Sequence, residues 1–255
     1  MPYRKIVVGT DGSDSAARAV NHAGWLARTL DAELNVIHAY DESETETESK
    51  SVGSSVLRDA CGGLEDLDPK AHLRRGNAVG TLISLAEEEG ADLIVVGNRG
   101  MGKRQVLVGS VPSRVAPRTP CDLLIAHTTG TRAEGEYGRV LIATDGSPTA
   151  SRAAFTGAAL ARAVGVPAAL LYVGDEARGG DIVNRTAEEA GATSAERITA
   201  SGDPAEEIVR VAEDAACDLI VVGNKGMVGA RRFLTSVPSR VARRARCHVL
   251  LVKTT

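Results

Sequence analysis

Short apolar runs alternate along the chain with longer amphipathic stretches. Residues 6–9 and 93–97 are such runs, rich in Val, Ile and Leu and ending at glycine, which is typical of strands buried on both faces of a parallel sheet. After the first run, Ser13 is placed to cap a helix that extends to about Leu30. The apolar residues of this stretch share one helical face, at Ala16, Val20, Ala23, Ala27 and Leu30.

The same alternation continues through the first half of the chain. Residues 40–55 are acidic and Ser-rich, so we expect a loop there, followed by a helix. Alternating strands and helices with doubly buried strands predict an open α/β sheet with helices on both faces and a ligand site at the carboxyl ends of the strands. Further strands are predicted at 33–38, 71–74 and 123–127, and further helices at 81–90 and 110–116.

The pattern occurs twice. Residues 92–116 and 218–242 are identical at 16 of 25 positions without a gap, and the sequence TDGS at 10–13 recurs at 144–147. The repeat is too long for a solenoid, whose units run from about 20 to 50 residues. The chain therefore contains two copies of one domain.

The duplication fixes the expected domain organisation. We expect domains at 1–130 and 137–255, joined by a polar, Gly- and Thr-rich linker at 128–138. Each domain should be an open, doubly wound sheet of five mainly parallel strands. In the second repeat, residues 203–206 supply an N-cap aspartate, an N1 proline and a capping-box glutamate in order.

Composition narrows the class of protein. The chain has 255 residues, 43% of them hydrophobic but only 3% aromatic, so its core must be built from Val, Ile, Leu and Ala. A net charge of −3 leaves no basic surplus for binding nucleic acid. No apolar run approaches the roughly 18–20 residues that span a bilayer, and no signal peptide precedes the first strand. We expect a cytoplasmic protein that binds neither nucleic acid nor membrane.

Glycines gather where the run at 93–97 ends. Gly97 and Gly100 follow this strand directly, and Gly109 and Ser110 stand where the last helix begins. Glycine allows positive φ and a close approach of a ligand to the backbone, and the N–H groups at a helix N-terminus favour phosphate. The pattern predicts a phosphate site, unless the glycines only shape a tight turn and Ser110 only caps the helix.

An aspartate ends the first strand of each repeat. The carboxylates of Asp11 and Asp145 could accept hydrogen bonds from a ribose or an adenine amine, or hold a metal ion. Alternatively, each forms an Asx-turn before the helix capped by Ser13 or Ser147. The residues alone leave both readings open.

Together these motifs resemble the universal stress protein family, and the two-domain members in particular, over nearly the whole chain. The family's nucleotide motif G-x2-G-x9-G-S/T is matched by Gly97, Gly100, Gly109 and Ser110, with eight residues instead of nine in the long gap. The resemblance implies a Rossmann-like fold of the adenine nucleotide α-hydrolase type. It also implies that ATP or AMP, with or without Mg²⁺, binds at the carboxyl ends of the strands.

The resemblance further implies which residues bind the nucleotide. Residues at the first strand would approach the adenosine, those after the second would meet adenine, and the glycine motif would hold ribose and phosphates. In the first repeat these are Thr10, Asp11, Ala39, Gly97, Gly100, Gly109, Ser110 and Val111, with Arg99 within reach of phosphate. In the second they are Thr144, Asp145, Val173, Gly223, Gly226, Ser236 and Val237. Thr235 stands where the motif has the glycine matching Gly109, and we expect weaker binding, or a shorter nucleotide, at the second site.

The sequence contains no Ser-His-Asp set, no zinc cluster and no P-loop. Taken with this absence, the resemblance implies an ATP- or AMP-binding regulatory protein of the stress response that acts on an unidentified protein partner. The alternatives are a slow Mg²⁺-dependent ATPase that uses Asp11, and a nucleotide-free dimerising scaffold. Single-domain relatives pair through their last strands, so we expect residues 123–127 to meet residues 249–253 across a pseudo-two-fold axis. Homodimers of the whole chain remain open.

Overall fold

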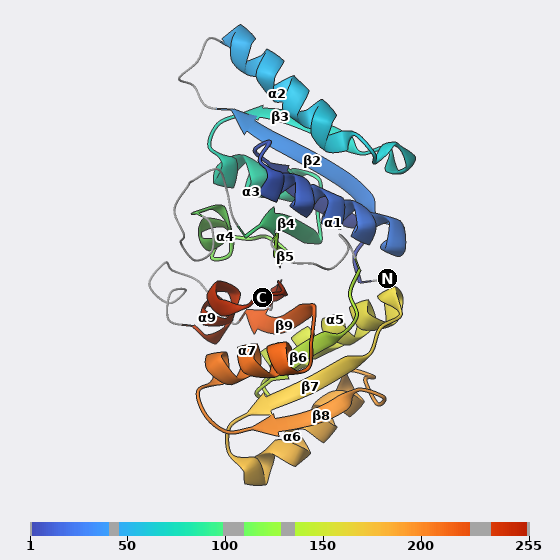
Figure 1. Cartoon of the computed structure of the whole chain (residues 1–255), viewed down its shortest axis with the longest axis vertical. Coiled ribbons are helices and arrows are strands. Elements are labelled where there is room, and N and C mark those ends of the chain that lie inside the picture. Colours follow the sequence, from blue (N-terminus) through green and yellow to red (C-terminus); the bar gives the residue numbers. More distant parts are fainter. Residues whose placement is uncertain (1, 41–45, 99–109, 129–135, 225–235, 254–255) are drawn as a thin grey trace. The chain divides into compact units, whose positions relative to one another are not determined.

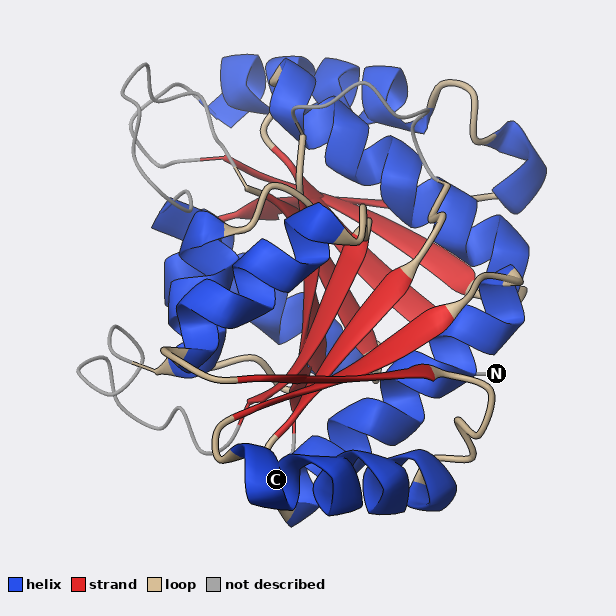
Figure 2. Cartoon of the chain, turned by 60° about the horizontal axis from the view of Figure 1, so that its bottom comes forward, coloured by secondary structure: helices blue, strands red, loops and turns tan. Residues whose placement is uncertain are grey.

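The computed structural model describes residues 2–40, 46–98, 110–128, 136–224 and 236–253, with the backbone alone at 46–49 and 110. The chain divides into two compact units, Tyr3–Glu136 and Tyr137–Thr255, which we call the amino-terminal and carboxyl-terminal units (Figure 1). Each unit is a parallel five-stranded sheet with helices on both faces (Figure 2). The predicted fold class is confirmed in both units.

In the amino-terminal unit the strands lie in the order β3-β2-β1-β4-β5, and every neighbouring pair is parallel. Because β2 and β4 lie on opposite sides of β1, the direction of winding reverses between β1 and β4. Helices α3 and α4 contact each other on one face, and α1 and α2 cover the other. The elements are β1 (Lys5–Thr10), α1 (Asp14–Leu30), β2 (Glu33–Tyr40), α2 (Glu46–Cys61), a 3₁₀ turn (Glu65–Leu67), β3 (Lys70–Arg75), α3 (Ala78–Glu88), β4 (Leu93–Gly97), α4 (Ser110–Val115) and β5 (Asp122–Ala126).

The carboxyl-terminal unit repeats this topology. Its strands lie in the order β10-β9-β6-β7-β8, all parallel, with the reversal between β6 and β9. Helices α7 and α9 share one face, and α5 and α6 share the other. The elements are β6 (Val140–Thr144), α5 (Pro148–Val164), β7 (Ala168–Val173), α6 (Glu176–Glu189), β8 (Glu196–Ala200), α7 (Pro204–Asp214), β9 (Leu219–Asn224), α9 (Val237–Arg244) and β10 (His248–Lys253).

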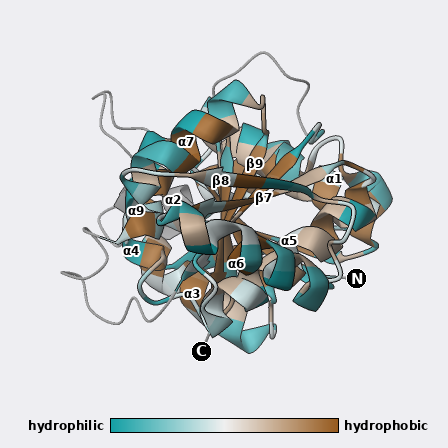
Figure 3. Cartoon of the chain, turned by 90° about the horizontal axis from the view of Figure 1, so that it is seen from below, coloured by the Kyte–Doolittle hydropathy of each residue, from teal (hydrophilic) through white to brown (hydrophobic). Residues whose placement is uncertain are grey.

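Hydrophobic periodicity and capping explain the first helix of each unit. The five predicted apolar positions of α1 are all buried, and the central strands are apolar on both faces, as the hydropathy colouring shows (Figure 3). Ser13 caps α1 by accepting from the backbone N–H of Ala16. Ser147 caps α5 in the same way at Ala150. These caps fix the point where the chain leaves each first strand.

The predicted loop at 40–55 is wrong over most of its length. Strand β2 extends to Tyr40, residues 41–45 lie outside the described part, and helix α2 begins at Glu46. Its buried stripe includes Gly53, where a Cβ would lie 2.5 Å from Cδ1 of Leu73 and 3.0 Å from Cδ2 of His38. Leu57, one turn later, is also buried. Packing against β2 and β3 therefore overrides the weak helix propensity of the serines.

Helix α3 begins at Ala78, three residues before the predicted start. Asn77 is the N-cap, and its Oδ1 accepts from the backbone N–H of Gly80 at 2.8 Å. The earlier start matters for the site, because it brings the first turn of α3 over the ends of β1 and β2. Within the described ranges, no helix has the length and apolar character needed to cross a membrane.

Candidate functional site

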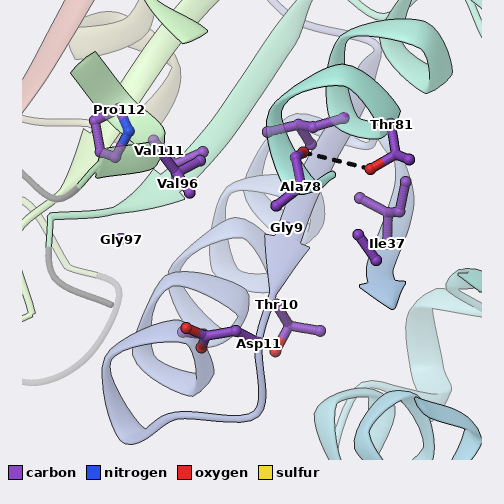
Figure 4. A pocket seen from close by; sticks show the side chains of 13 residues that line it. Gly9, Thr10, Asp11, Ile37, Ala78, Thr81, Val96, Gly97, Val111 and Pro112 are labelled. Atoms are coloured by element: carbon purple, nitrogen blue, oxygen red, sulfur yellow. Dashed lines mark hydrogen bonds between the residues drawn. The ribbon is translucent and has the colours of Figure 1, made fainter. Parts of the chain in front are cut away.

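A cavity opens at the carboxyl ends of the strands in the amino-terminal unit, where the winding reverses between β1 and β4. Figure 4 shows Thr10 and Asp11 at the end of β1, with Val96, Gly97 and helix α4 across the opening. This is the position at which open α/β sheets bind ligands. The lining residues are Gly9, Thr10, Asp11, Ala16, Ile37, Ala39, Ala78, Thr81, Leu82, Val96, Gly97, Val111 and Pro112.

The turn after β1 holds Asp11 in a fixed orientation. Its Oδ1 accepts from the backbone N–H of Ser13 at 3.0 Å and from the Ser13 hydroxyl at 2.5 Å. Gly12, with φ of +77°, donates its N–H to Oγ1 of Thr10 at 3.2 Å. The Asx-turn therefore forms, and Asp11 also lines the cavity. In the described chain only Ser13 donates to this carboxylate, so its Oδ2 can accept from a ligand.

Strand β2 supplies one side of the cavity through Ile37 and Ala39. His38, between them, points elsewhere: its Nδ1 lies 3.0 Å from the backbone O of Thr10. The imidazole thereby ties the end of β2 to the end of β1. This contact fits a structural histidine, which sets the spacing of the two strand ends.

The segment that follows β4 is anchored where it leaves the sheet. The backbone N–H of Asn98 donates to the carbonyl O of Ala126 at 2.9 Å. Oδ1 of Asn98 accepts from the backbone N–H of Thr128 at 3.1 Å and from its hydroxyl at 2.7 Å. Asn98 thus joins the start of the glycine segment to the residues after β5.

The structure describes part of the predicted glycine motif. Gly97 and Val111 line the cavity, and Ser110 is the first residue of α4. The predicted residues Arg99, Gly100 and Gly109 lie outside the described residues.

The carboxyl-terminal unit has a cavity at the equivalent strand ends. Of the residues predicted for it, those within the described chain all line this cavity, namely Thr144, Asp145, Val173, Gly223, Ser236 and Val237. Gly226 and Thr235 lie outside the described residues, so the expected effect of Thr235 stays a prediction. The remaining lining residues are Ala143, Ser147, Thr149, Ala150, Leu171, Pro204, Ile208, Val222 and Pro238.

The two cavities use the same turn but differ in size. Oδ1 of Asp145 accepts from the backbone N–H of Ser147 at 2.9 Å, as Asp11 does from Ser13, and Asp145 is exposed. The cavity beside β6 has a volume of about 330 Å³ and the one beside β1 about 90 Å³. The larger one reaches the lower end of the range typical of small-molecule sites, about 300–1,000 Å³.

Gly223 is glycine for a reason that the sequence argument missed. The sequence predicts that glycines after the strand provide positive φ or allow a ligand to approach the backbone, yet Gly223 is not among the described glycines with positive φ. A Cβ there would lie 2.9 Å from the carbonyl O of Thr149 and 2.8 Å from its Cγ2. The end of β9 runs so close to the first turn of α5 that no side chain fits between them.

One wall of each cavity is formed by helix residues that the sequence did not predict. Ala78, Thr81 and Leu82 of α3 line the first, and Pro204 and Ile208 of α7 line the second. These residues carry no distinctive chemistry. The signal that could have found them is the N-cap before each helix, which marks a helix start at the carboxyl edge of the sheet. Among the residues that the structure describes, no group of His, Cys, Asp and Glu is arranged to hold a metal ion.

A sequence model of the universal stress protein family matches residues 2–127 and 174–253, more than half of the chain and parts of both units. The chain belongs to the universal stress protein family. It is a tandem, two-domain universal stress protein, as the repeat in its sequence indicates.

Two relatives show how much of this universal stress protein is shared. Universal stress protein Rv1636 of Mycobacterium tuberculosis is 39% identical over 145 residues, which cover 50% of this chain and 98% of that protein. A crystal structure of a universal stress protein from Archaeoglobus fulgidus is 21% identical, with a TM-score of 0.82 over 99% of this chain and 97% of that one. It has the same fold. A universal stress protein solved in complex with cAMP is 34% identical and covers 51% of this chain and 100% of that chain, with a TM-score of 0.43.

Proposed function

We propose that this universal stress protein binds an adenine nucleotide, ATP or AMP, at the carboxyl ends of the strands in one or both units and acts as a regulatory protein in a stress response. The observation that carries the proposal is the recurrence of one cavity in both units. Thr10 and Asp11 line the first, and Thr144 and Asp145 line the second at the equivalent positions. Both units therefore have a cavity at the winding reversal, which is where open α/β sheets bind their ligands.

The lining supports a ligand with an apolar face and a polar end. Ile37, Leu82 and Val96 offer apolar contacts for a base. Thr10 and Asp11 offer oxygen atoms to hydroxyl or amine donors, and the turn hydrogen bonds fix their positions before a ligand arrives. Such preorganisation lowers the entropic cost of binding. The proposal includes the cytoplasm as the compartment, where adenine nucleotides are available.

Slow hydrolysis is the second candidate, and the carboxylate of Asp11 favours it. Asp11 is the one acidic residue among the described residues that line the first cavity. Mg²⁺ in nucleotide sites is commonly held by one or two carboxylates together with phosphate oxygens. If Asp11 holds Mg²⁺, Asp11→Asn should abolish turnover of ATP and leave the far-UV circular dichroism spectrum unchanged.

The first test is to denature freshly purified protein and identify any released nucleotide by mass spectrometry, with its molar ratio to protein. We expect AMP or ATP at about one per chain if the second site is the weaker, and about two per chain if the sites are equal. Intact ATP after long incubation with Mg²⁺ would argue against the ATPase. Protein that releases no nucleotide and takes up none from added ATP and Mg²⁺ would refute the proposal in favour of a scaffold.

The pairing of the repeats through residues 123–127 and 249–253 stays a prediction. A protease site placed within 129–135 tests it. After cleavage, we expect the two halves to elute together in size-exclusion chromatography. Halves that separate without denaturant would contradict it.

A further inference from the structure

Three ion pairs join α7 and its N-cap to α9 in the carboxyl-terminal unit, and the longest is between Arg240 and Glu206 at 3.9 Å. Arg240 donates from Nη1 and Nη2 to the two carboxylate oxygens of Asp203, at 2.8 and 2.7 Å. Arg244 donates to Oε1 of Glu206 at 2.9 Å. The predicted capping-box acid, Glu206, is therefore directed to α9. Asp203 caps α7, accepting from the backbone N–H of Glu206 at 3.1 Å, and binds Arg240 at the same time.

The amino-terminal unit keeps both arginines and lacks both acids. Aligning the repeats places Arg114 opposite Arg240 and Arg118 opposite Arg244, but Asn77 and Gly80 stand at the positions of the two acids. Arg114 and Arg118 are exposed. Within the described ranges neither has a hydrogen bond or ion pair to a side chain, whereas Asn77 still caps its helix through Gly80.

Arg114 follows directly on the part of α4 that lines the first cavity. It is on α4, three residues after Val111 and two after Pro112, and both of these line the cavity. In the other unit the guanidinium of Arg240 reaches Asp203, directly before the lining residue Pro204. By the equivalence of the repeats, an arginine at 114 can reach the start of α3, where Ala78 lines the first cavity.

We propose that Arg114 binds phosphate at the amino-terminal site, and that Asp203 withholds Arg240 from the same role at the carboxyl-terminal site. This rests on the proposed function and names the ligand class that each site takes. A guanidinium without an acidic partner offers two donors to a phosphate. A guanidinium that is already bound to a carboxylate has fewer free donors for a phosphate, and the ion pair as a whole carries no net charge. The first site therefore favours nucleotides with more phosphates, and the second discriminates less between a nucleotide and its nucleoside.

Arg185 is a further cation that the described residues place near the second cavity, but it does not serve the same edge. Nη2 of Arg185 lies 3.2 Å from the place where a Cβ of Gly146 would stand, and its Nε lies 3.9 Å from Glu189. Arg185 belongs to α6, which covers the sheet face opposite to α9. Among the described residues, the two cavities thus differ at the helix α4 or α9 edge in the acids at 203 and 206 against Asn77 and Gly80. Asp203 and Asn77 are the pair that directly precedes a lining residue, Pro204 or Ala78.

Exchanging these two residues tests the proposal, because Asn and Asp are comparable N-caps and each helix keeps its cap. Full-length protein is titrated with ATP and, separately, with adenosine. Hydrogen–deuterium exchange of peptides from α3 reports the first site, and of peptides from α7 the second. We expect Asn77→Asp and Arg114→Gln to weaken ATP binding at the first site about tenfold, the value of one charge-assisted contact at a partly exposed site.

Adenosine binding at the first site should stay within twofold in both variants. Asp203→Asn should strengthen ATP binding at the second site by a smaller factor, because Glu206 still lies 3.9 Å from Arg240. Arg118→Gln is the matched control: it removes the same charge from the same surface and should change ATP affinity less than threefold.

The outcomes separate this inference from the proposed function. ATP binding that is unchanged by Asn77→Asp and Arg114→Gln would overturn the role of Arg114 and leave nucleotide binding intact. Equal loss of ATP and adenosine affinity would also overturn it, because it would indicate damage to the cavity instead of a lost phosphate contact. Absence of any exchange protection by ATP or adenosine in the wild type would overturn both.

Discussion

The two units distribute volume differently between the first helix and the first strand: one pairs a smaller helix residue with a larger strand residue, and the other does the reverse. This predicts that the effect of Gly157→Ala on stability changes sign with the residue at position 142. In the carboxyl-terminal unit, Gly157 of α5 packs on Ile142 of β6. At the equivalent positions of the other unit, α1 has Ala23 and β1 has Val8. All four sites are buried. Each helix–sheet contact therefore combines a smaller and a larger residue with nearly the same total volume.

The geometry sets the size of the effect. A Cβ on Gly157 would lie 2.9 Å from Cγ1 of Ile142 and 3.2 Å from Cγ1 of Val221, too close without movement. Overpacking of this kind costs about 1–3 kcal/mol, and replacing a helix glycine by alanine returns about 1 kcal/mol. We expect Gly157→Ala alone to destabilise the unit by about 1 kcal/mol. In an Ile142→Ala background Cγ1 and Cδ1 of residue 142 are both absent, so the clash with this residue is relieved, and Gly157→Ala should stabilise by about 1 kcal/mol.

The assay is hydrogen exchange of peptides from β6 and β9 in the wild type, both single variants and the double variant. Peptides from this unit report its opening free energy separately from that of the other unit. The double-mutant cycle then isolates the coupling between positions 142 and 157. A Gly157→Ala effect of the same sign and size in both backgrounds, within about 0.5 kcal/mol, would refute the packing argument.

Three further outcomes follow from buried or paired groups. Hydrogen bonds from Arg240 hold the pKa of Asp203 below its ordinary value of 3.8, so the stability from ionised Asp203 is present at neutral pH and is lost as the pH falls through the lowered pKa. The difference in urea midpoint between wild type and Asp203→Asn should therefore shrink in acid. Burial raises the pKa of the Cys247 thiol to about 12, so iodoacetamide at pH 8 should label Cys247 only after denaturation, as mass spectrometry would show. Tyr3→Phe removes a buried hydrogen bond of 2.9 Å to Asp122 and should lower the free energy of unfolding by about 1 kcal/mol; an unchanged urea midpoint would contradict this.

The sequence was most informative at the strand ends. Periodicity located β4 at its observed bounds and Ser13 as a cap, and the repeat drew attention to Thr10, Asp11 and Gly97, because polar or glycine residues interrupt apolar runs there. These signals are local, so a single sequence carries them.

Features that depend on packing between distant segments were not predictable. Residues 46–55 of helix α2 were predicted as a loop because the buried stripe of the helix includes Gly53, whose smallness matters only against His38 and Leu73. The close approach of Gly223 to Thr149 is likewise visible only in three dimensions. The exchange of Asp203 for Asn77 was present in the aligned repeats, but its meaning depends on Arg240 reaching across from α9.

The anchor at Asn98 has a mechanical consequence. One amide oxygen accepts two hydrogen bonds from Thr128, whose hydroxyl also lies 2.9 Å from that of Ser15 in the first turn of α1. A ligand that displaces Asn98 must either break both hydrogen bonds between Asn98 and Thr128 or move Thr128 together with Asn98. Within the amino-terminal unit, a displacement at the end of β4 is therefore coupled to a displacement of the residues after β5 and of the first turn of α1.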